Sequence, residues 1–425
     1  MKNLNYKQFI LSVVLFIVFL LNPAYADSES VLNLAVRAPQ SISTFIQASL
    51  NHQPELLAAE ANIDLAKANL RASRQPIYNP NLEFNYEKSG LTTRSVGISQ
   101  TIDWANQQDH RESVANAKLN QEISHYQVIK QTFISGLLIS LAKNQTEKQL
   151  LKLSSESLHL MLEFKQIAER RYLAGDLTKV ELNLATLAYN QALMEQAAAY
   201  SNSMSAYEAL QSIADVRPSE IPVLPEQLPQ PNLPQDLDLF LNTLPVIKAE
   251  LAEIEAARQQ VLLSKSEQSW DPTIGVTIGT EGSDDLIGLN LNIPLNIRNN
   301  FSAEVDIAYQ NMVSREYLSQ KTYRNLRTSL KVSTERYRSL LTVWNNWREN
   351  NRGHVAEQLA LVNQLWQAGD INATDYLLQI KQALEIKITG YRLRNQLWQV
   401  AFDWMKVTAS VDQWLDINVA YKEKG

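Results

Sequence analysis

Two pairs of short segments alternate apolar residues with polar or small ones, which is the period of a β-strand whose two faces meet different surroundings. The apolar positions of the first pair, and then of the second, are Leu82, Phe84, Tyr86, Val96, Ile98, Ile102 and Trp104, followed by Ile274, Val276, Ile278, Leu289, Leu291, Ile293 and Leu295. Within each pair a short glycine-containing turn joins the segments, as in a hairpin: Lys88-Ser89-Gly90 and Glu281-Gly282-Ser283-Asp284. The pattern predicts one β-hairpin over 82–103 and another over 273–294.

Longer segments place apolar residues alternately four and three positions apart, the spacing of a coiled-coil seam. Three such seams are Leu119, Ile123, Tyr126, Phe133 and Leu137; Val180, Leu184, Leu187, Gln191, Met194 and Ala198; and Leu326, Leu330, Tyr337, Leu340, Trp344 and Trp347. No proline falls between 81 and 217 or after 294, and a proline costs about 3 kcal/mol inside a helix. We therefore expect long helices over 105–173 and 298–367, each reaching roughly 100 Å, with Gly136 and Gly353 as candidate bends.

The same order of segments occurs twice along the chain. For example, the turn sequence Leu173-Ala174-Gly175-Asp176 returns as Gln367-Ala368-Gly369-Asp370. The repetition predicts two structural repeats, over 27–216 and 237–415, each a helix, a hairpin, a long helix, a tip turn (at 175 and at 369) and a helix. Six prolines crowd between 218 and 234, so 217–236 is predicted to be a linker in the equatorial region. Residues 416–425 are predicted to form a C-terminal tail.

The N-terminal 26 residues have the pattern of a secretory signal peptide. Lys2 and Lys7 precede an apolar stretch, and Ala24-Tyr25-Ala26 fits a cleavage site. The chain contains no cysteine, which excludes disulfides and a lipid anchor on an N-terminal cysteine. The net charge is −6, and the chain has no basic run, so nucleic acid is not an expected partner. We expect an exported protein without a lipid anchor.

The alternating strands are typical of a transmembrane barrel with an apolar outside and a water-filled inside, although a half-buried soluble sheet alternates in the same way. Four strands are too few to enclose an aqueous channel, whereas three chains supply twelve. Trp104 and Trp270 fall at strand ends, where membrane-interface aromatics occur. The predicted fold is mainly α with a small β part: a trimeric barrel of duplicated long helices topped by a 12-stranded β-barrel in outer-membrane lipid.

Residues suited to catalysis or metal binding do not form a motif. The five histidines have no spacing of metal ligands, and the sequence lacks the glycine-rich and nucleophile motifs of common enzymes. We therefore predict that the protein is not an enzyme and holds no metal and no cofactor.

The two predicted tips carry the most specific pattern. The first reads Arg170-Arg171-Tyr172-Leu173-Ala174-Gly175-Asp176 and the second Leu365-Trp366-Gln367-Ala368-Gly369-Asp370, with Glu181 and Asp375 six residues past the two glycines. Glycine permits the positive φ of a tight reversal, and the following aspartate suits the start of a helix. With the duplicated unit and the proline-rich midpoint, these tips make the chain similar to the TolC family of outer-membrane efflux channels.

This resemblance implies a homotrimeric exit duct of a tripartite efflux system, which extends from the outer membrane into the periplasm. It implies that a periplasmic adaptor, which works with an inner-membrane pump, docks on the tips at Arg171, Gly175, Asp176, Gly369 and Asp370. It also implies a pore aperture formed by Glu181 and Asp375, whose carboxylates would form rings that attract cations.

One position departs from the family pattern. Where the best-known member has a Tyr and an Arg that hold the tip closed, this chain has Trp366 and Ile371. The two hypotheses are a leakier resting state, or closure of the aperture by packing of Trp366. The alternative functions are a duct for type I protein secretion and, in a different class, a soluble periplasmic coiled-coil scaffold or adaptor. An adaptor normally carries one helical hairpin, without the tandem duplication.

Overall fold

The computed structural model describes residues 36–214, 221–351 and 353–417. The signal peptide predicted for 1–26 lies outside the described residues. So do the start of the first predicted repeat, residues 217–220 of the predicted linker and most of the predicted tail.

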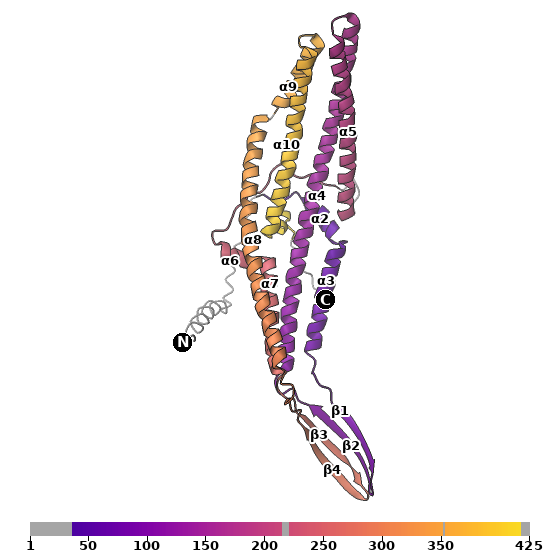
Figure 1. Cartoon of the computed structure of the whole chain (residues 1–425), viewed down its shortest axis with the longest axis vertical. Coiled ribbons are helices and arrows are strands. Elements are labelled where there is room, and N and C mark those ends of the chain that lie inside the picture. The colour runs from indigo at the N-terminus through magenta and orange to yellow at the C-terminus, as the bar shows by residue number, and fades with distance from the viewer. Residues whose placement is uncertain (1–35, 215–220, 352, 418–425) are drawn as a thin grey trace. The chain divides into compact units, whose positions relative to one another are not determined.

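The first half of the chain contains four helices and two strands in the described range (Figure 1). They are α2 (Gln40–Leu50), α3 (Pro54–Ser73), β1 (Asn81–Lys88), β2 (Thr92–Thr101), α4 (Gln107–Ala174) and α5 (Lys179–Ala214). The helix α4 is 68 residues long, which the absence of proline from this stretch permits. Gly136 lies inside α4 without interrupting it.

The second half follows the same order, with one additional break. Its elements are α6 (Leu237–Thr243), α7 (Pro245–Ser266), β3 (Thr273–Glu281), β4 (Asp284–Asn292), α8 (Ser302–Asn351), α9 (His354–Ala368), α10 (Ala373–Val407) and α11 (Val411–Leu415). The long helical stretch predicted over 298–367 is divided into α8 and α9 next to Gly353, one of the two glycines named as candidate bends. Gly353, at the start of α9, has a φ of 88°, a left-handed conformation that a continuous helix cannot contain.

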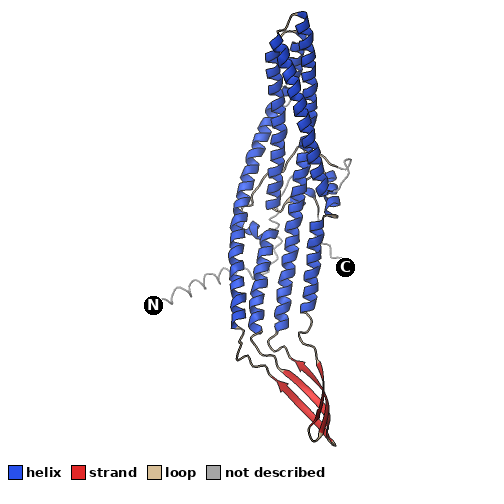
Figure 2. Cartoon of the chain, turned by 45° about the vertical axis from the view of Figure 1, so that its right-hand side comes forward, coloured by secondary structure: helices blue, strands red, loops and turns tan. Residues whose placement is uncertain are grey.

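The four strands form one antiparallel sheet in the order β1-β2-β3-β4. The two hairpins join along β2 and β3, where Val96 pairs with Ile278 and Ile98 with Val276. Figure 2 shows the strands gathered at the ends of the helices that lead into and out of them, namely α3, α4, α7 and α8. In the single chain β1 and β4 are the two edges of this sheet, and each leaves a row of backbone N–H and C=O groups unpaired.

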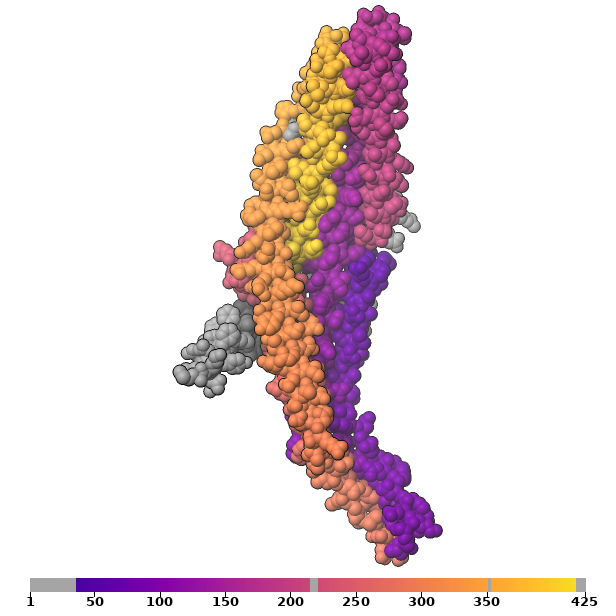
Figure 3. Space-filling view, viewed as in Figure 1, coloured from indigo at the N-terminus to yellow at the C-terminus, as the bar shows by residue number. Residues whose placement is uncertain are grey.

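The helices bury two of the three predicted seams. Tyr126 and Phe133 of α4 are buried, as are Leu330 and Tyr337 of α8. Figure 3 shows α10 (yellow) lying between α8 (orange) and α5 (magenta). This arrangement lets α10 contact both halves of the chain.

The seam predicted on α5 packs only in part within the described chain, because Leu184 contacts the core whereas three other members remain exposed. Val180, Leu187 and Met194 are 77%, 66% and 67% exposed. Small residues on another side of α5 contact the neighbouring helices instead, and they are Ala185, Ala188 and Ala192. Alanine permits a closer approach of two helices than leucine or methionine does, which explains why the larger residues point away. Val180, Leu187 and Met194 therefore form an exposed apolar stripe along α5 in the described part of the single chain.

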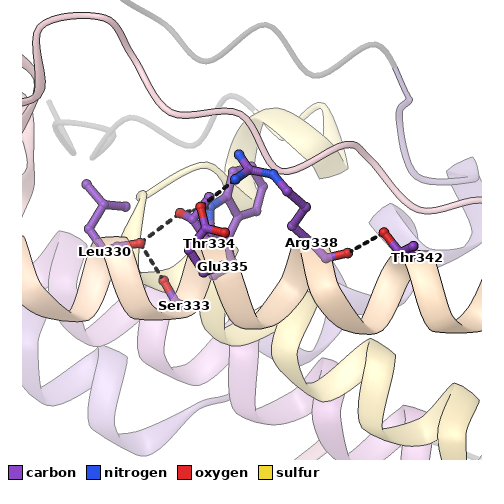
Figure 4. A network of polar contacts seen from close by, with 7 residues as sticks. Leu330, Ser333, Thr334, Glu335, Arg338 and Thr342 are labelled. Carbon is purple, nitrogen blue, oxygen red and sulfur yellow. Dashed lines mark hydrogen bonds and ion pairs between the residues drawn. The ribbon is translucent and has the colours of Figure 1, made fainter.

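Polar contacts fix the middle of the helical region. Thr334 of α8 donates to the Leu330 carbonyl at 2.7 Å (Figure 4). It also accepts a hydrogen bond from the Trp404 indole at 3.0 Å. Lys130 of α4, only 1% exposed, forms an ion pair with Asp412 of α11 at 2.8 Å. None of the helices in the described ranges is long and apolar enough to cross a membrane.

Candidate functional site

The first tip is a tight reversal between α4 and α5. Gly175 ends α4 with a φ of 83°, and the Asp176 N–H donates to the Arg171 carbonyl at 2.8 Å. This is the hydrogen-bond pattern with which a left-handed glycine closes a helix. The second tip has the same geometry, since Gly369 has a φ of 91° and the Asp370 N–H donates to the Leu365 carbonyl at 2.9 Å.

The acidic residues that follow the two tips each cap the start of a helix. The Glu181 carboxylate accepts hydrogen bonds from the backbone N–H and the hydroxyl of Thr178, at 2.9 Å and 2.7 Å. The backbone hydrogen bond first, and the hydroxyl second, hold the pKa of Glu181 below its usual value. At the second tip, the Asp375 N–H donates to Asn372 Oδ1 at 2.9 Å, and Asn372 Nδ2 donates to the Asp375 carboxylate at 2.7 Å. Glu181 with Thr178 therefore forms a capping box, whereas Asn372 is the N-cap of α10 and the Asp375 carboxylate accepts a hydrogen bond from its side chain.

Trp366 lies in the core beside the second tip. Its side chain is 0% exposed, and its ring centroid lies 5.0 Å from that of Phe164 and 5.2 Å from that of Tyr376. Closure of the aperture by packing of Trp366 stays a prediction, and in the single chain this side chain is enclosed and does not face a lumen. The physical reason is that α4, α9 and α10 bury this large ring to remove its apolar surface from water.

Arg171 joins the two tips. Its guanidinium lies over the Trp366 ring at 4.5 Å and donates to the Trp366 carbonyl at 2.6 Å. The space that it occupies depends on Gly369, where an added Cβ would lie 3.2 Å from Arg171 Nη2. This contact was not predicted, because the two partners are 195 residues apart and no local pattern connects them. Whereas Arg171 is half-buried, Asp176 and Asp370 are exposed at the two tips.

The sheet has two unlike faces. One face consists of large apolar side chains exposed on this single chain, namely Leu82, Phe84, Val96, Ile98, Val276, Ile278, Ile287, Leu289 and Leu291. The other face carries small and polar residues together with Leu286, the cross-strand partner of Gly279. At Gly279 an added Cβ would lie 2.0 Å from the Arg94 carbonyl oxygen. Only glycine permits such a close approach of two strands.

Aromatic and polar contacts join the base of the sheet to the helices. The rings of Trp104 and Trp270 stack with centroids 6.2 Å apart, and both remain exposed. Asp271 is buried, and its carboxylate accepts three hydrogen bonds. The donors are the Tyr78 hydroxyl at 2.8 Å, the side-chain amide of Gln107 at 3.0 Å and the backbone N–H of Trp104 at 3.1 Å.

Tyr78 keeps its proton in this network. Burial first, then the hydrogen bond to Asp271, raises its pKa to about 12. Because the hydroxyl remains a donor at physiological pH, the segment before β1 stays tied to the segment before β3.

No group of His, Asp and Glu side chains within the described ranges could hold a metal ion.

Comparison with known proteins identifies the fold. No family model matches the sequence, and no curated protein sequence matches it. Among solved structures, the CmeC outer membrane channel of Campylobacter jejuni is similar with a TM-score of 0.71 and 12% identity, over 88% of this chain and 89% of that one.

Two further channels are equally similar. The open state of the MtrE outer membrane channel of Neisseria gonorrhoeae has a TM-score of 0.72 and 13% identity, over 88% of this chain and 90% of that one. The outer membrane protein VceC of Vibrio cholerae has a TM-score of 0.68 and 15% identity, over 87% and 96%. The long helices, the doubled tip turn and the four-stranded sheet of this chain thus form the fold of the TolC family of outer-membrane channels.

Proposed function

We propose that this protein is an outer-membrane channel that serves as the exit duct of a tripartite efflux system. The observation that carries this proposal is the sheet. One face exposes nine large apolar side chains, the other carries small and polar ones, and both edges lack a partner strand. A soluble monomer rarely exposes so large an apolar surface, whereas three such sheets joined edge to edge form a 12-stranded barrel with lipid outside and water inside.

The apolar stripe on α5 supports a trimer independently of the sheet. Val180, Leu187 and Met194 recur every seven residues and remain largely exposed in the described part of the single chain. A sevenfold repeat is the spacing at which one helix lies along another. In the proposed assembly the stripe packs against a helix of the next protomer, which continues the β-barrel as a helical barrel in the periplasm.

The tips fit the role of a docking end. They lie at the ends of the helices that point away from the sheet, and Asp176 and Asp370 are exposed there. In the proposed system a periplasmic adaptor, coupled to an inner-membrane pump, binds these tips, and the duct conducts cargo passively. Three copies of Glu181 and of Asp375 then lie near the periplasmic opening and favour cations.

Fractionation and heat modifiability test the duct. The full chain is expressed, outer and inner membranes are separated, and the outer-membrane fraction is run unboiled and boiled on a denaturing gel. We expect a trimer band that collapses to the monomer on boiling. A Leu187→Glu variant places a charge on the α5 stripe and should lose the trimer, whereas Leu173→Glu, at the exposed tip, should keep it. A soluble monomer would overturn the proposal in favour of a periplasmic scaffold.

Ion selectivity tests the role of the acidic residues. In planar bilayers Asp375→Asn should reduce the preference for K⁺ over Cl⁻, because three charges leave the proposed aperture. Asp370→Asn is the matched control, since it removes the same charge five residues away at the tip turn. Equal effects of the two substitutions would contradict an aperture at Asp375. Cross-linking of tip variants to the adaptor in cells, with and without pump expression, tests the tripartite assembly against a duct for protein secretion.

A further inference from the structure

The charged residues of the sheet are separated by face. The two cations of the strands, Lys88 and Arg94, lie on the apolar face, because they share the alternation of Tyr86 and Val96. Four of the five acids lie on the opposite face, and they are Glu83, Glu87, Glu281 and Asp284. The fifth, Asp285, lies on the apolar face at the edge strand β4. Both cations are therefore directed toward the side that the proposed function assigns to lipid.

Both cations also lie at one end of the apolar face. Arg94 and Lys88 follow the last large apolar row, Phe84, Val96, Ile278 and Ile287, on the side of the hairpin turns. The Trp104–Trp270 pair closes the other end. Ten residues separate Arg94 from Trp104, which at about 3.4 Å per residue and a tilt near 40° is roughly 25 Å along the membrane normal. That height matches the apolar band of an outer-membrane barrel, so Arg94 lies at the level of the outer headgroups.

The surroundings of Arg94 leave its charge available. The side chains of Arg94, Lys88 and Tyr86 are exposed, and the Arg94 guanidinium lies 5.9 Å from the centre of the Tyr86 ring. Within residues 36–214, 221–351 and 353–417, neither Arg94 nor Lys88 forms an ion pair with a carboxylate. An aromatic ring beside a cation is the arrangement found at membrane interfaces, where the ring contacts the acyl boundary and the cation contacts phosphate.

We propose that Arg94, Lys88 and Tyr86 form a binding site for the phosphate of an anionic lipid headgroup in the outward leaflet. This inference rests on the proposed function, since it requires the apolar face to contact lipid. Arg94 supplies several N–H donors to phosphate oxygens, and Lys88 supplies a second cation beside it. The acids of the opposite face stay in the water-filled interior, where they do not repel the headgroup. The site would hold the barrel at a defined depth and rotation in the membrane.

The test compares lipid binding by three purified full-length proteins. They are the wild type, the double variant Lys88→Gln/Arg94→Gln, and a matched control, Arg324→Gln/Lys331→Gln, which removes two exposed cations from α8. Each protein in nonionic detergent is titrated with fluorescent phosphatidylglycerol and, separately, with phosphatidylcholine. We expect the wild type and the control to prefer phosphatidylglycerol. In the double variant the ratio of the two affinities should fall at least roughly fivefold, because each interfacial cation contributes about 1 kcal/mol to the binding of an anionic lipid.

Two further measurements separate the possible failures. Glycerol phosphate at the concentration of the lipid should not compete, because it lacks the acyl chains that the apolar band contacts; complete competition would overturn the assignment to a lipid. The same samples are run unboiled on a gel. If the wild type forms a trimer but the double variant keeps the full preference for phosphatidylglycerol, the headgroup site is wrong and the duct stands. If the wild type forms no trimer, both proposals fail.

Discussion

The contact between Arg171 and Trp366 is expected to hold the two tips together, and Arg171→Met tests it. Methionine keeps an unbranched apolar stem but removes the guanidinium. The variant therefore loses the 2.6 Å hydrogen bond to the Trp366 carbonyl and the cation that lies 4.5 Å from the ring. The Trp366 carbonyl also accepts a hydrogen bond from the Gly369 N–H at 3.2 Å. Losing the Arg171 contact should therefore weaken the backbone structure of the second tip.

The magnitude follows from the two interactions. A hydrogen bond from a charged donor contributes about 1.5–3 kcal/mol, and a cation over an aromatic ring about 0.5–2 kcal/mol. Because Arg171 is only half-buried, the lower ends apply, and their sum is about 2 kcal/mol. Local opening of the second tip should then be roughly 30-fold more frequent. Native-state hydrogen exchange of the Gly369 and Asp370 amides measures this opening directly.

Two controls make the result specific. Arg170→Met removes a neighbouring exposed cation and should leave exchange at Gly369 unchanged. Trp366→Leu removes the ring but keeps the backbone carbonyl, so a double-mutant cycle of Arg171→Met with Trp366→Leu isolates the cation–ring interaction, expected to be about 0.5–1 kcal/mol. If Arg171→Met and Arg170→Met accelerate exchange equally, Arg171 does not join the tips and the reasoning fails.

Three other perturbations have defined outcomes. Gly279→Ala should abolish the heat-stable trimer on a gel, because its Cβ would lie 2.0 Å from a backbone oxygen of the facing strand. Asp412→Asn removes the carboxylate that pairs with the buried Lys130 at 2.8 Å and should lower the free energy of unfolding by about 1.5–3 kcal/mol, the contribution of a hydrogen bond to a charged group; an unchanged denaturation midpoint would contradict this. The pKa of Glu181 is lowered, so its ionised carboxylate stabilises the start of α5 at neutral pH. This stabilisation is lost as the pH falls through the lowered pKa. Hydrogen exchange near Thr178 should rise in acid for the wild type and stay flat for Glu181→Gln.

Patterns of short range in the sequence predict much of this structure. The alternating strands, the coiled-coil seams on α4 and α8 and the two glycine tip turns each depend on residues within a few positions of one another. Local spacing determines which face of a strand or helix is apolar, because the backbone geometry of each element is regular. The absence of proline similarly permits a helix of 68 residues. These features, with the tip pattern, were sufficient to indicate the TolC-type fold before the structure was known.

What each apolar or charged residue faces depends on the tertiary structure. The α5 seam could be recognised from its spacing, but only the packed chain shows that alanines contact its neighbours while Val180 and Leu187 remain exposed. The position of Trp366 in the sequence, three residues before Gly369, predicts that it lies at the tip. In the structure, three helices from both halves of the chain enclose its side chain. The local sequence does not distinguish Gly353, where the helix is interrupted, from Gly136, where α4 continues. The reason is that glycine permits a break in a helix without requiring one. Contacts between residues nearly 200 positions apart, such as Arg171 with Trp366, arise only when the two repeats fold against each other.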